Sequence, residues 1–239
     1  MFGWRARLGL LVPCINTVLE PEFRHILPIG IDFFTTRMLM KGSSKLEKLS
    51  SMESSLDLCL ESLIDITDIF LYACTSGSFI KGLTWDNELQ HRIYMKTKKK
   101  AVTAMQSLVY ALHVFSAKNI VVATPYIPEV NEKQRSFFQE CGFNVLKIEG
   151  MNIIEHGGSG YIESESIYDF AKQVLTGTSP DVLVLSCTNF RTLNIIEKLE
   201  TDLNIPVISS NQALLWNALR SLNITEMILG HGSLLKGIK

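Results

Sequence analysis

Short apolar runs alternate along the chain with longer amphipathic stretches, and this alternation predicts the secondary structure. Short apolar runs are typical of buried strands, whereas apolar residues that recur every three or four positions are typical of helices. The predicted strands are Arg7–Val12, Ile31–Thr36, Ile69–Ala73, Asn119–Ala123, Asn144–Ile148, Val182–Ser186 and Pro206–Ser209. The predicted helices are Leu46–Asp65, Asp86–Ala111, Asn131–Cys141, Ser164–Thr176, Thr192–Leu203 and Asn211–Leu222. The pattern indicates an α/β fold in which helices cover parallel sheets.

An internal repeat divides the chain into two similar halves. A strand ends in Pro13 near the start, and another ends in Pro125 halfway along. Cys74 follows the first proline by 61 residues, and Cys187 follows the second by 62 residues. The repeat predicts two pseudo-symmetric subdomains, residues 1–112 plus about 210–239 and residues 113–209. Because ligands of open α/β sheets bind at the carboxyl ends of the strands, we expect a cleft between the subdomains, with one cysteine on each wall.

Cys74 and Cys187 share a local design that favours chemistry. Each follows an apolar strand and precedes a hydroxyl residue, Thr75 or Thr188. The backbone N–H groups of such a turn, together with a helix that starts there, would lower the pKa of a thiol and bind a carboxylate. The alternative is that each cysteine is a small buried hydrophobic residue. Two cysteines at equivalent positions of a repeat favour function, and the remaining three, which lack this design, are interpreted as structural or pocket-lining: Cys14, Cys59 and Cys141.

Three further side chains are candidates for the cleft. Asn16 and Tyr126 follow the two strand-end prolines, where an amide and a phenol could bind a carboxylate or an enolate oxygen. The alternatives are turn formation for Asn16 and packing for Tyr126. His156 stands near the loops expected at the cleft, although an exposed loop histidine is the competing interpretation. The glycine-rich segment 157–160 is predicted to be a loop.

Composition and charge exclude several classes of function. The formal net charge is -1, which makes nucleic acid a poor partner, and the basic run 96–100 is interpreted as the solvated face of a helix. No apolar run is long enough to cross a membrane, and we interpret the segment 8–12 as a strand and not as a signal peptide. We therefore expect a cytoplasmic protein with reduced thiols. The cysteine spacing predicts no zinc site, and no nucleotide-binding glycine motif is present.

Several motifs, in order along nearly the whole chain, resemble one enzyme family. They are Gly9–Pro13 with Asn16-Thr17 and Glu20–Phe23, Thr36–Met38, Ala73–Ser78, Thr124–Tyr126, Ser186–Thr192, and Ser209–Ala213 before Trp216. This set resembles maleate cis-trans isomerases and arylmalonate decarboxylases of the aspartate/glutamate racemase superfamily. The resemblance implies two Rossmann-like subdomains whose parallel sheets face an interdomain cleft, and thiol chemistry without a cofactor or a metal.

Within this family, the cysteines distinguish the branches. Arylmalonate decarboxylases have a glycine where this chain has Cys74, whereas maleate isomerases and racemases have cysteines on both sides. The resemblance therefore implies isomerisation of a maleate-like dicarboxylate, with Cys74 as nucleophile and Cys187 as acid/base. The carboxylates would be held by Asn16, Thr75, Ser76, Tyr126 and Thr188, with His156 in the binding set. Maleate isomerases place an asparagine in the region of His156, which leaves maleate itself open as the substrate.

Other functions remain open at this point. A racemase would use one cysteine to remove an α-proton and the other to return it, and an arylmalonate-type decarboxylase belongs to the same superfamily. A carboxylate-binding regulatory protein is the alternative without catalysis, although binding alone does not require paired thiols. In each case the expected partner is a small carboxylic acid, and a homodimer or a higher homo-oligomer is left open.

Overall fold

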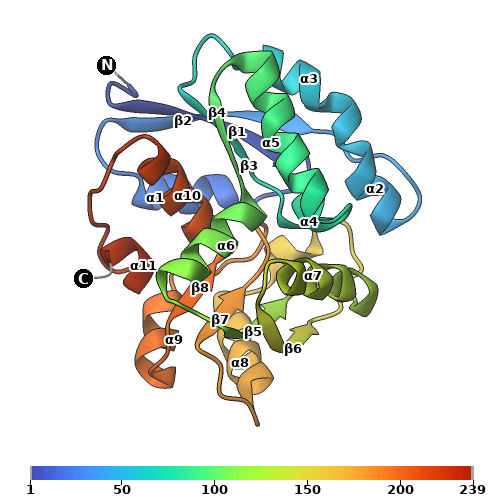
Figure 1. Ribbon diagram of the computed structural model, residues 1–239, viewed down its shortest axis with the longest axis vertical. Coiled ribbons are helices and arrows are strands. Elements are labelled where there is room, and N and C mark those ends of the chain that lie inside the picture. Colours follow the sequence, from blue (N-terminus) through green and yellow to red (C-terminus); the bar gives the residue numbers. More distant parts are fainter. Residues whose placement is uncertain (1, 238–239) are drawn as a thin grey trace.

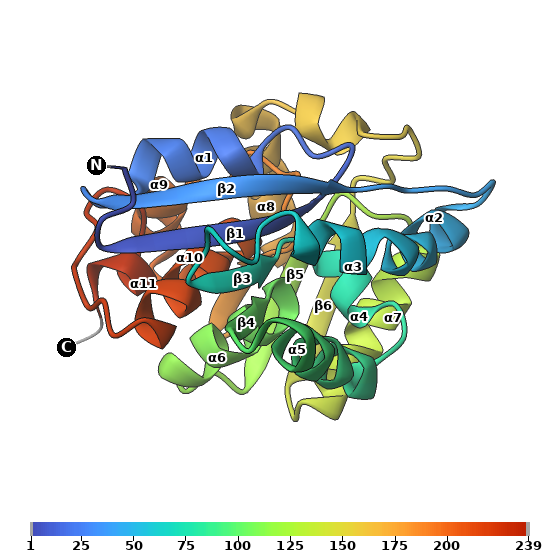
Figure 2. The ribbon, with the colours of Figure 1, turned by 90° about the horizontal axis from the view of Figure 1, so that it is seen from above.

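Two four-stranded parallel sheets form the framework of the computed structural model, which describes residues 2–237. The first sheet has the order β2-β1-β3-β4, which Figure 2 shows from above, and the second has the order β6-β5-β7-β8. The strands are β1 (Ala6–Pro13), β2 (Ile31–Met38), β3 (Ile69–Tyr72), β4 (Lys100–Thr103), β5 (Asn119–Thr124), β6 (Asn144–Gly150), β7 (Val182–Leu185) and β8 (Val207–Ser209). The two orders are the same when strands are counted within each half, so the predicted fold class is confirmed.

Helices cover both faces of each sheet. They are α1 (Leu19–Ile26), α2 (Lys45–Ser51), α3 (Glu53–Glu61), α4 (Thr75–Phe79), α5 (Leu83–Thr97), α6 (Ala104–Val114), α7 (Pro128–Glu140), η1 (Gly158–Tyr161), α8 (Ser164–Leu175), α9 (Ile196–Leu203), α10 (Ser210–Ser221) and α11 (Ser233–Lys236). Among the helices of the described residues, none combines the length and the apolar character that a bilayer span requires.

The position of each strand explains its sequence pattern. β1 and β5 have a hydrogen-bonded neighbour on each side, and almost all of their residues are buried. A parallel strand that is covered on both faces reads as a continuous apolar run, which is why the sequence predicts these strands well. The edge strands β2 and β6 are half-exposed and carry more polar residues.

The helix that follows each sheet packs against the other sheet. α6 follows β4 and also contacts β8, whereas α10 follows β8 and also contacts β3 and β4 (Figure 1). The two helices also pack extensively against each other. This exchange joins the two halves into one body. The subdomain boundaries at residues 112 and 210 stay a prediction, although α10 does contact the first sheet as that division requires.

The predicted helix 86–111 is wrong, because the chain is interrupted there by a strand. α5 ends where Lys98 adopts a left-handed conformation, with φ 57°. β4 follows, and α6 begins only at Ala104. With two apolar residues on an edge, β4 is too short to show a strand pattern. The basic run is therefore not one helix face: the Lys99 ammonium group donates to the carbonyls of Ile64 and Thr67.

Two other predicted helices have different bounds. The predicted helix 46–65 consists of α2 and α3, which meet at Met52. The predicted helix 192–203 begins only at Ile196, so the segment 187–195 after the second cysteine has no regular helix. This difference matters for the site, because only the first cysteine has a helix directly after it.

Candidate active site

A cavity of about 680 Å³ lies where the carboxyl ends of the central strands of both sheets meet. Its walls include Pro13 at the end of β1 and Pro125 directly after β5, as the repeat predicts. All eight predicted site residues line this one cavity: Cys74 and Cys187, with Asn16, Thr75, Ser76, Tyr126, His156 and Thr188. The structure therefore brings the whole predicted set together. Cys14 is not among the residues that line the cavity.

Cys74 caps the amino end of α4. Its sulfur accepts a hydrogen bond from the N–H of Gly77 at 3.3 Å and lies 3.8 Å from the Ser76 hydroxyl oxygen. Burial nevertheless raises the pKa of Cys74 to about 12, and these hydrogen bonds lower it only in part. The expected lowering of this pKa is therefore wrong for the ligand-free protein, because desolvation of a buried thiolate outweighs the donors of one short turn. Cys74 is held as a neutral thiol.

Cys187 sits in a different turn. Its sulfur accepts a hydrogen bond from the N–H of Asn189 at 3.3 Å, two residues further along, because no helix begins there. In the Cys74 turn the equivalent donor is three residues further along. The two sulfurs thus receive similar backbone hydrogen bonds from turns of different shape. All five cysteines are free thiols.

Thr188 connects the two cysteine turns directly. Its hydroxyl donates to the carbonyl of Ala73, the residue before Cys74, at 3.0 Å. It also accepts from the side-chain amide of Asn16 at 3.1 Å. The side-chain oxygen of Asn16 in turn accepts from two backbone N–H groups at the start of α1. Asn16 therefore has the turn-forming role weighed as its alternative, and both side chains shape the cavity that they line.

Tyr126 stands between the two turns. Side-chain hydrogen bonds link its hydroxyl to Cys187 and to Ser76. Burial, followed by the charge of Cys187, raises the pKa of Tyr126 well above its ordinary value. Its ring packs edge-to-face against Phe79 of α4, with centroids 6.1 Å apart. The phenol therefore stays neutral, and it can act as a hydrogen-bond donor to an anion.

The glycine-rich segment contributes site residues that the sequence did not identify. Asn189 donates to the Gly157 carbonyl at 3.3 Å and to the Ser159 hydroxyl at 3.0 Å, and all three residues line the cavity. The segment contains η1 and is not only a loop. Gly160 approaches Asn189 and Thr17 so closely that a Cβ atom there would lie 2.5 Å from the Thr17 hydroxyl oxygen. His156 next to this segment is exposed and lines the same cavity.

The remaining wall is mainly apolar, and it too was missed. It is built by Ile15, Met40, Leu49, Ile127, Ile153 and Ile154. Lys48 of α2 lines the cavity and offers a positive charge for a carboxylate. These residues come from segments without a recognisable motif, so only the folded arrangement reveals them.

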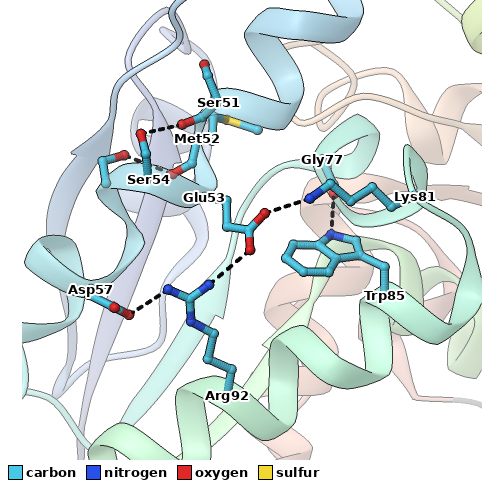
Figure 3. Close-up of polar contacts among 10 residues, drawn as sticks. Ser51, Met52, Glu53, Ser54, Asp57, Gly77, Lys81, Trp85 and Arg92 are labelled. Atoms are coloured by element: carbon cyan, nitrogen blue, oxygen red, sulfur yellow. Dashed lines mark hydrogen bonds and ion pairs between the residues drawn. The ribbon is translucent and has the colours of Figure 1, made fainter.

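A cluster of hydrogen bonds and ion pairs connects α4 and the turn after it to α3 and α5 (Figure 3). The indole N–H of Trp85 donates to the Gly77 carbonyl at 3.2 Å. Glu53 of α3 accepts from Lys81 at 2.6 Å and from Arg92 of α5 at 3.2 Å. These contacts hold α4, whose amino end Cys74 caps, against α3 and α5.

The fold and the cavity define the class of this protein. It is an α/β protein of two similar halves, with two free thiols in the cavity between them. Within the described part of the chain, no group of three or more histidine, cysteine, aspartate or glutamate residues could hold a metal ion. The described part of the cavity lining offers thiols, hydroxyls and amides, the side chains of Lys48 and His156, and the carboxylates of Glu129 and Glu155.

The model of the arylmalonate decarboxylase family matches residues 8–235, and the chain belongs to this family. A curated maleate isomerase of Pseudomonas putida is 29% identical, and the alignment covers 97% of each chain. A maleate isomerase of Nocardia farcinica is 26% identical, with 96% of this chain and 95% of the relative covered.

Solved structures agree with these relatives. The crystal structure of a maleate isomerase from Pseudomonas putida is 25% identical, has a TM-score of 0.91, and is matched over 97% of this chain and 98% of that chain. A cysteine-to-serine mutant of the Nocardia farcinica maleate cis-trans isomerase, with a covalently bound succinylcysteine intermediate, has the same identity and TM-score over 98% and 99% of the chains. The comparisons confirm the predicted family and an enzyme of the isomerase class.

Proposed function

We propose that the chain isomerises a maleate-like cis-unsaturated dicarboxylate to its trans form, with Cys74 as nucleophile and Cys187 as acid and base. The main support for the proposal is that both thiols line one cavity. The turns that carry them are connected by hydrogen bonds of Thr188 and Tyr126. Maleate as the substrate class comes from the relatives, which act on maleate by name.

The raised pKa of Cys74 defines the first step. The step requires Cys187 in its thiolate form. Because Cys74 starts as a thiol, its proton passes to that thiolate while its sulfur bonds to one alkene carbon. The electron pair of the double bond moves to the other alkene carbon and into the adjacent carboxylate. Cys187 then delivers the proton to that carbon, which gives a succinyl thioether on Cys74.

Rotation and release complete the reaction. The former double bond is now single, so its ends turn relative to each other. Cys187 removes the proton again, the electron pair restores the double bond, and the carbon–sulfur bond breaks. The sulfur of Cys74 takes the proton back, so no atom or electron is gained or lost over the cycle.

The polar wall would stabilise the charge that develops on the carboxylate. Tyr126 and Ser76 present hydroxyl groups between the two turns, and Asn16 presents an amide beside Thr188. Donors that are already held in place stabilise a developing charge without reorganising. Lys48 would pair with the second carboxylate from the α2 side.

One solved relative supports the unequal roles of the cysteines. A structure of the Nocardia farcinica enzyme holds a covalently bound succinylcysteine in a mutant in which one cysteine has been changed to serine, so the adduct lies on another cysteine. This is the behaviour expected when one thiol forms the bond and the other moves the proton.

Proton NMR in deuterated water, with a panel of cis-unsaturated dicarboxylates that includes maleate, tests the proposal. We expect the olefinic signal of the cis acid to be replaced by that of the trans acid. Exchange of an α-proton in an amino or hydroxy acid would instead identify a racemase, and loss of carbon dioxide from a malonate would identify a decarboxylase. No turnover of any acid, despite saturable binding, would favour a carboxylate-binding protein and overturn the proposal.

A further inference from the structure

Glu22 of α1 makes contacts that neither the cavity nor the proposed reaction explains. One of its carboxylate oxygens accepts from the backbone N–H groups of Thr192 and Leu193 at 2.9 and 3.0 Å. The other accepts from the side-chain amide of Asn211 on α10 at 2.6 Å. The carboxylate therefore joins α1, the segment after Cys187 and α10 at one point.

The same amide extends this connection to the cysteine itself. Asn211 donates its second hydrogen to the carbonyl of Thr188, the residue directly after Cys187, at 3.1 Å. Glu22 thus holds the irregular segment 187–195 at both ends, directly at residues 192–193 and through Asn211 at Thr188. Because this segment lacks the repetitive hydrogen bonds of a helix, such side-chain contacts determine its shape.

The chemistry of the contacts requires a carboxylate. All three groups that face the Glu22 oxygens are N–H donors, so both oxygens must be acceptors. A glutamine that turned its NH₂ group toward the backbone donors would lose two hydrogen bonds, and one that turned it toward Asn211 would lose one.

The repeat shows that this arrangement is specific to the Cys187 side. Glu22 follows Pro13 by nine residues, and Gln134 follows Pro125 by nine residues. Gln134 donates to the Ser186 hydroxyl and lies near Met105, which occupies the position in α6 that Asn211 occupies in α10. The equivalent position in the second half therefore carries no charge.

We infer that Glu22 is a positioning residue, whose carboxylate fixes the turn of Cys187 opposite Cys74. The effect of Glu22 on turnover rests on the proposed function, since it assumes that the chain isomerises a dicarboxylate. The position of the thiol itself can be measured without any substrate.

Glu22 also faces a second cavity of about 530 Å³, whose charged and titratable side chains are His25, Glu163, Glu165, Arg191 and His231. Burial raises the pKa of Glu22 to about 7, and the hydrogen bonds from Asn211, Leu193 and Thr192 lower it only in part. The turn therefore loses its carboxylate acceptor when the pH falls below about 7.

Glu22→Gln tests the inference, with Glu200→Gln as the matched control. Glu200 of α9 is a half-buried glutamate that accepts from the N–H groups of Val207 and Ser233, and it is not among the residues that line the first cavity. Both variants lose a carboxylate that binds backbone donors. A general structural effect would therefore appear in both.

The first readout is the rate of alkylation by iodoacetamide at each cysteine, followed by peptide mass spectrometry. We expect Glu22→Gln to change the rate at Cys187 by about tenfold or more, with Cys59 in the core unchanged, because displacement of a turn alters access to its thiol. The second readout is kcat, which we expect to fall about a hundredfold with little change in KM. The acid limb of the wild-type kcat profile near pH 7 should be absent in this variant.

Asn211→Ala should change both readouts in the same direction but less, because it removes only the link to Thr188. Should Glu22→Gln fail to fold, this second variant carries the test. Alkylation and kcat that match Glu200→Gln would overturn the inference. A changed alkylation pattern in a protein that isomerises no dicarboxylate would uphold the inference and refute the proposed function.

Discussion

Replacement of Thr188 by valine tests whether the two cysteine turns depend on a single hydroxyl. Valine keeps the shape of threonine but removes the hydroxyl that donates to the Ala73 carbonyl and accepts from Asn16. All three residues are buried. Each net hydrogen bond contributes about 1 kcal/mol and each buried unpaired group costs about 1–3 kcal/mol, which predicts a loss of roughly 2–4 kcal/mol in the free energy of unfolding.

The effect on activity should exceed the effect on stability. Without the hydroxyl, the end of β3 before Cys74 and the turn of Cys187 are no longer joined, and a small displacement of reacting groups lowers kcat by about a hundredfold. Thr97→Val is the matched control, because the buried Thr97 hydroxyl also donates to one carbonyl and accepts from one N–H group, far from the cavity. Urea unfolding and steady-state kinetics measure both quantities. Equal losses of kcat in the two variants would refute the reasoning.

Three further substitutions test buried or closely packed groups in and around the site. Burial raises the pKa of Asp86 to about 7, so between pH 4 and 7 the folded protein keeps a proton that the unfolded chain releases, and the free energy of unfolding falls as the pH rises. Asp86→Asn should remove up to roughly 4 kcal/mol of this pH dependence, measured by urea unfolding at several pH values. An unchanged dependence of the free energy of unfolding on pH would contradict the raised pKa of Asp86. Gly160→Ala should lower the free energy of unfolding by about 1–3 kcal/mol, because its Cβ atom meets Thr17; a neutral effect would show that the segment can move away. Trp85→Phe removes the hydrogen bond to the Gly77 carbonyl and should cost about 1 kcal/mol with a slower reaction of Cys74; unchanged kinetics would show that α4 does not need this anchor.

The sequence predicts the parts of this fold that repeat. The spacing from Pro13 to Cys74 and from Pro125 to Cys187 is set by the same order of strands and helices in both halves, so it predicts a shared cavity from the chain alone. β4 escapes prediction because an edge strand of four residues has only two apolar positions, and the basic run that ends at its first residue, Lys100, extends the apparent pattern of α5.

The electrostatics of the site could not be predicted from local pattern. The turn after Cys74 does offer an N–H group to the sulfur, as its sequence indicates. The raised pKa of Cys74 results from burial, and the segments that bury it, such as the one that carries Tyr126, are brought together only by the packed structure. Glu22 shows the same limit: its motif was recognisable, but its contacts with Asn211 and with the segment after Cys187 lie 189 and 170 residues away in sequence.

The central claim is that Cys74 forms the covalent bond and Cys187 moves the proton. Its most direct test is mass spectrometry of peptides from the Cys187→Ser variant after mixing with the cis-dicarboxylate that the wild-type protein converts. In Cys187→Ser we expect a mass increase equal to one substrate molecule on the peptide that contains Cys74, because water can carry the Cys74 proton to carbon during slow addition, whereas release needs Cys187 to remove that proton again. We expect no such increase in the Cys74→Ala variant. An adduct on Cys187 in the Cys74→Ala variant, with none on Cys74 in the Cys187→Ser variant, would contradict it.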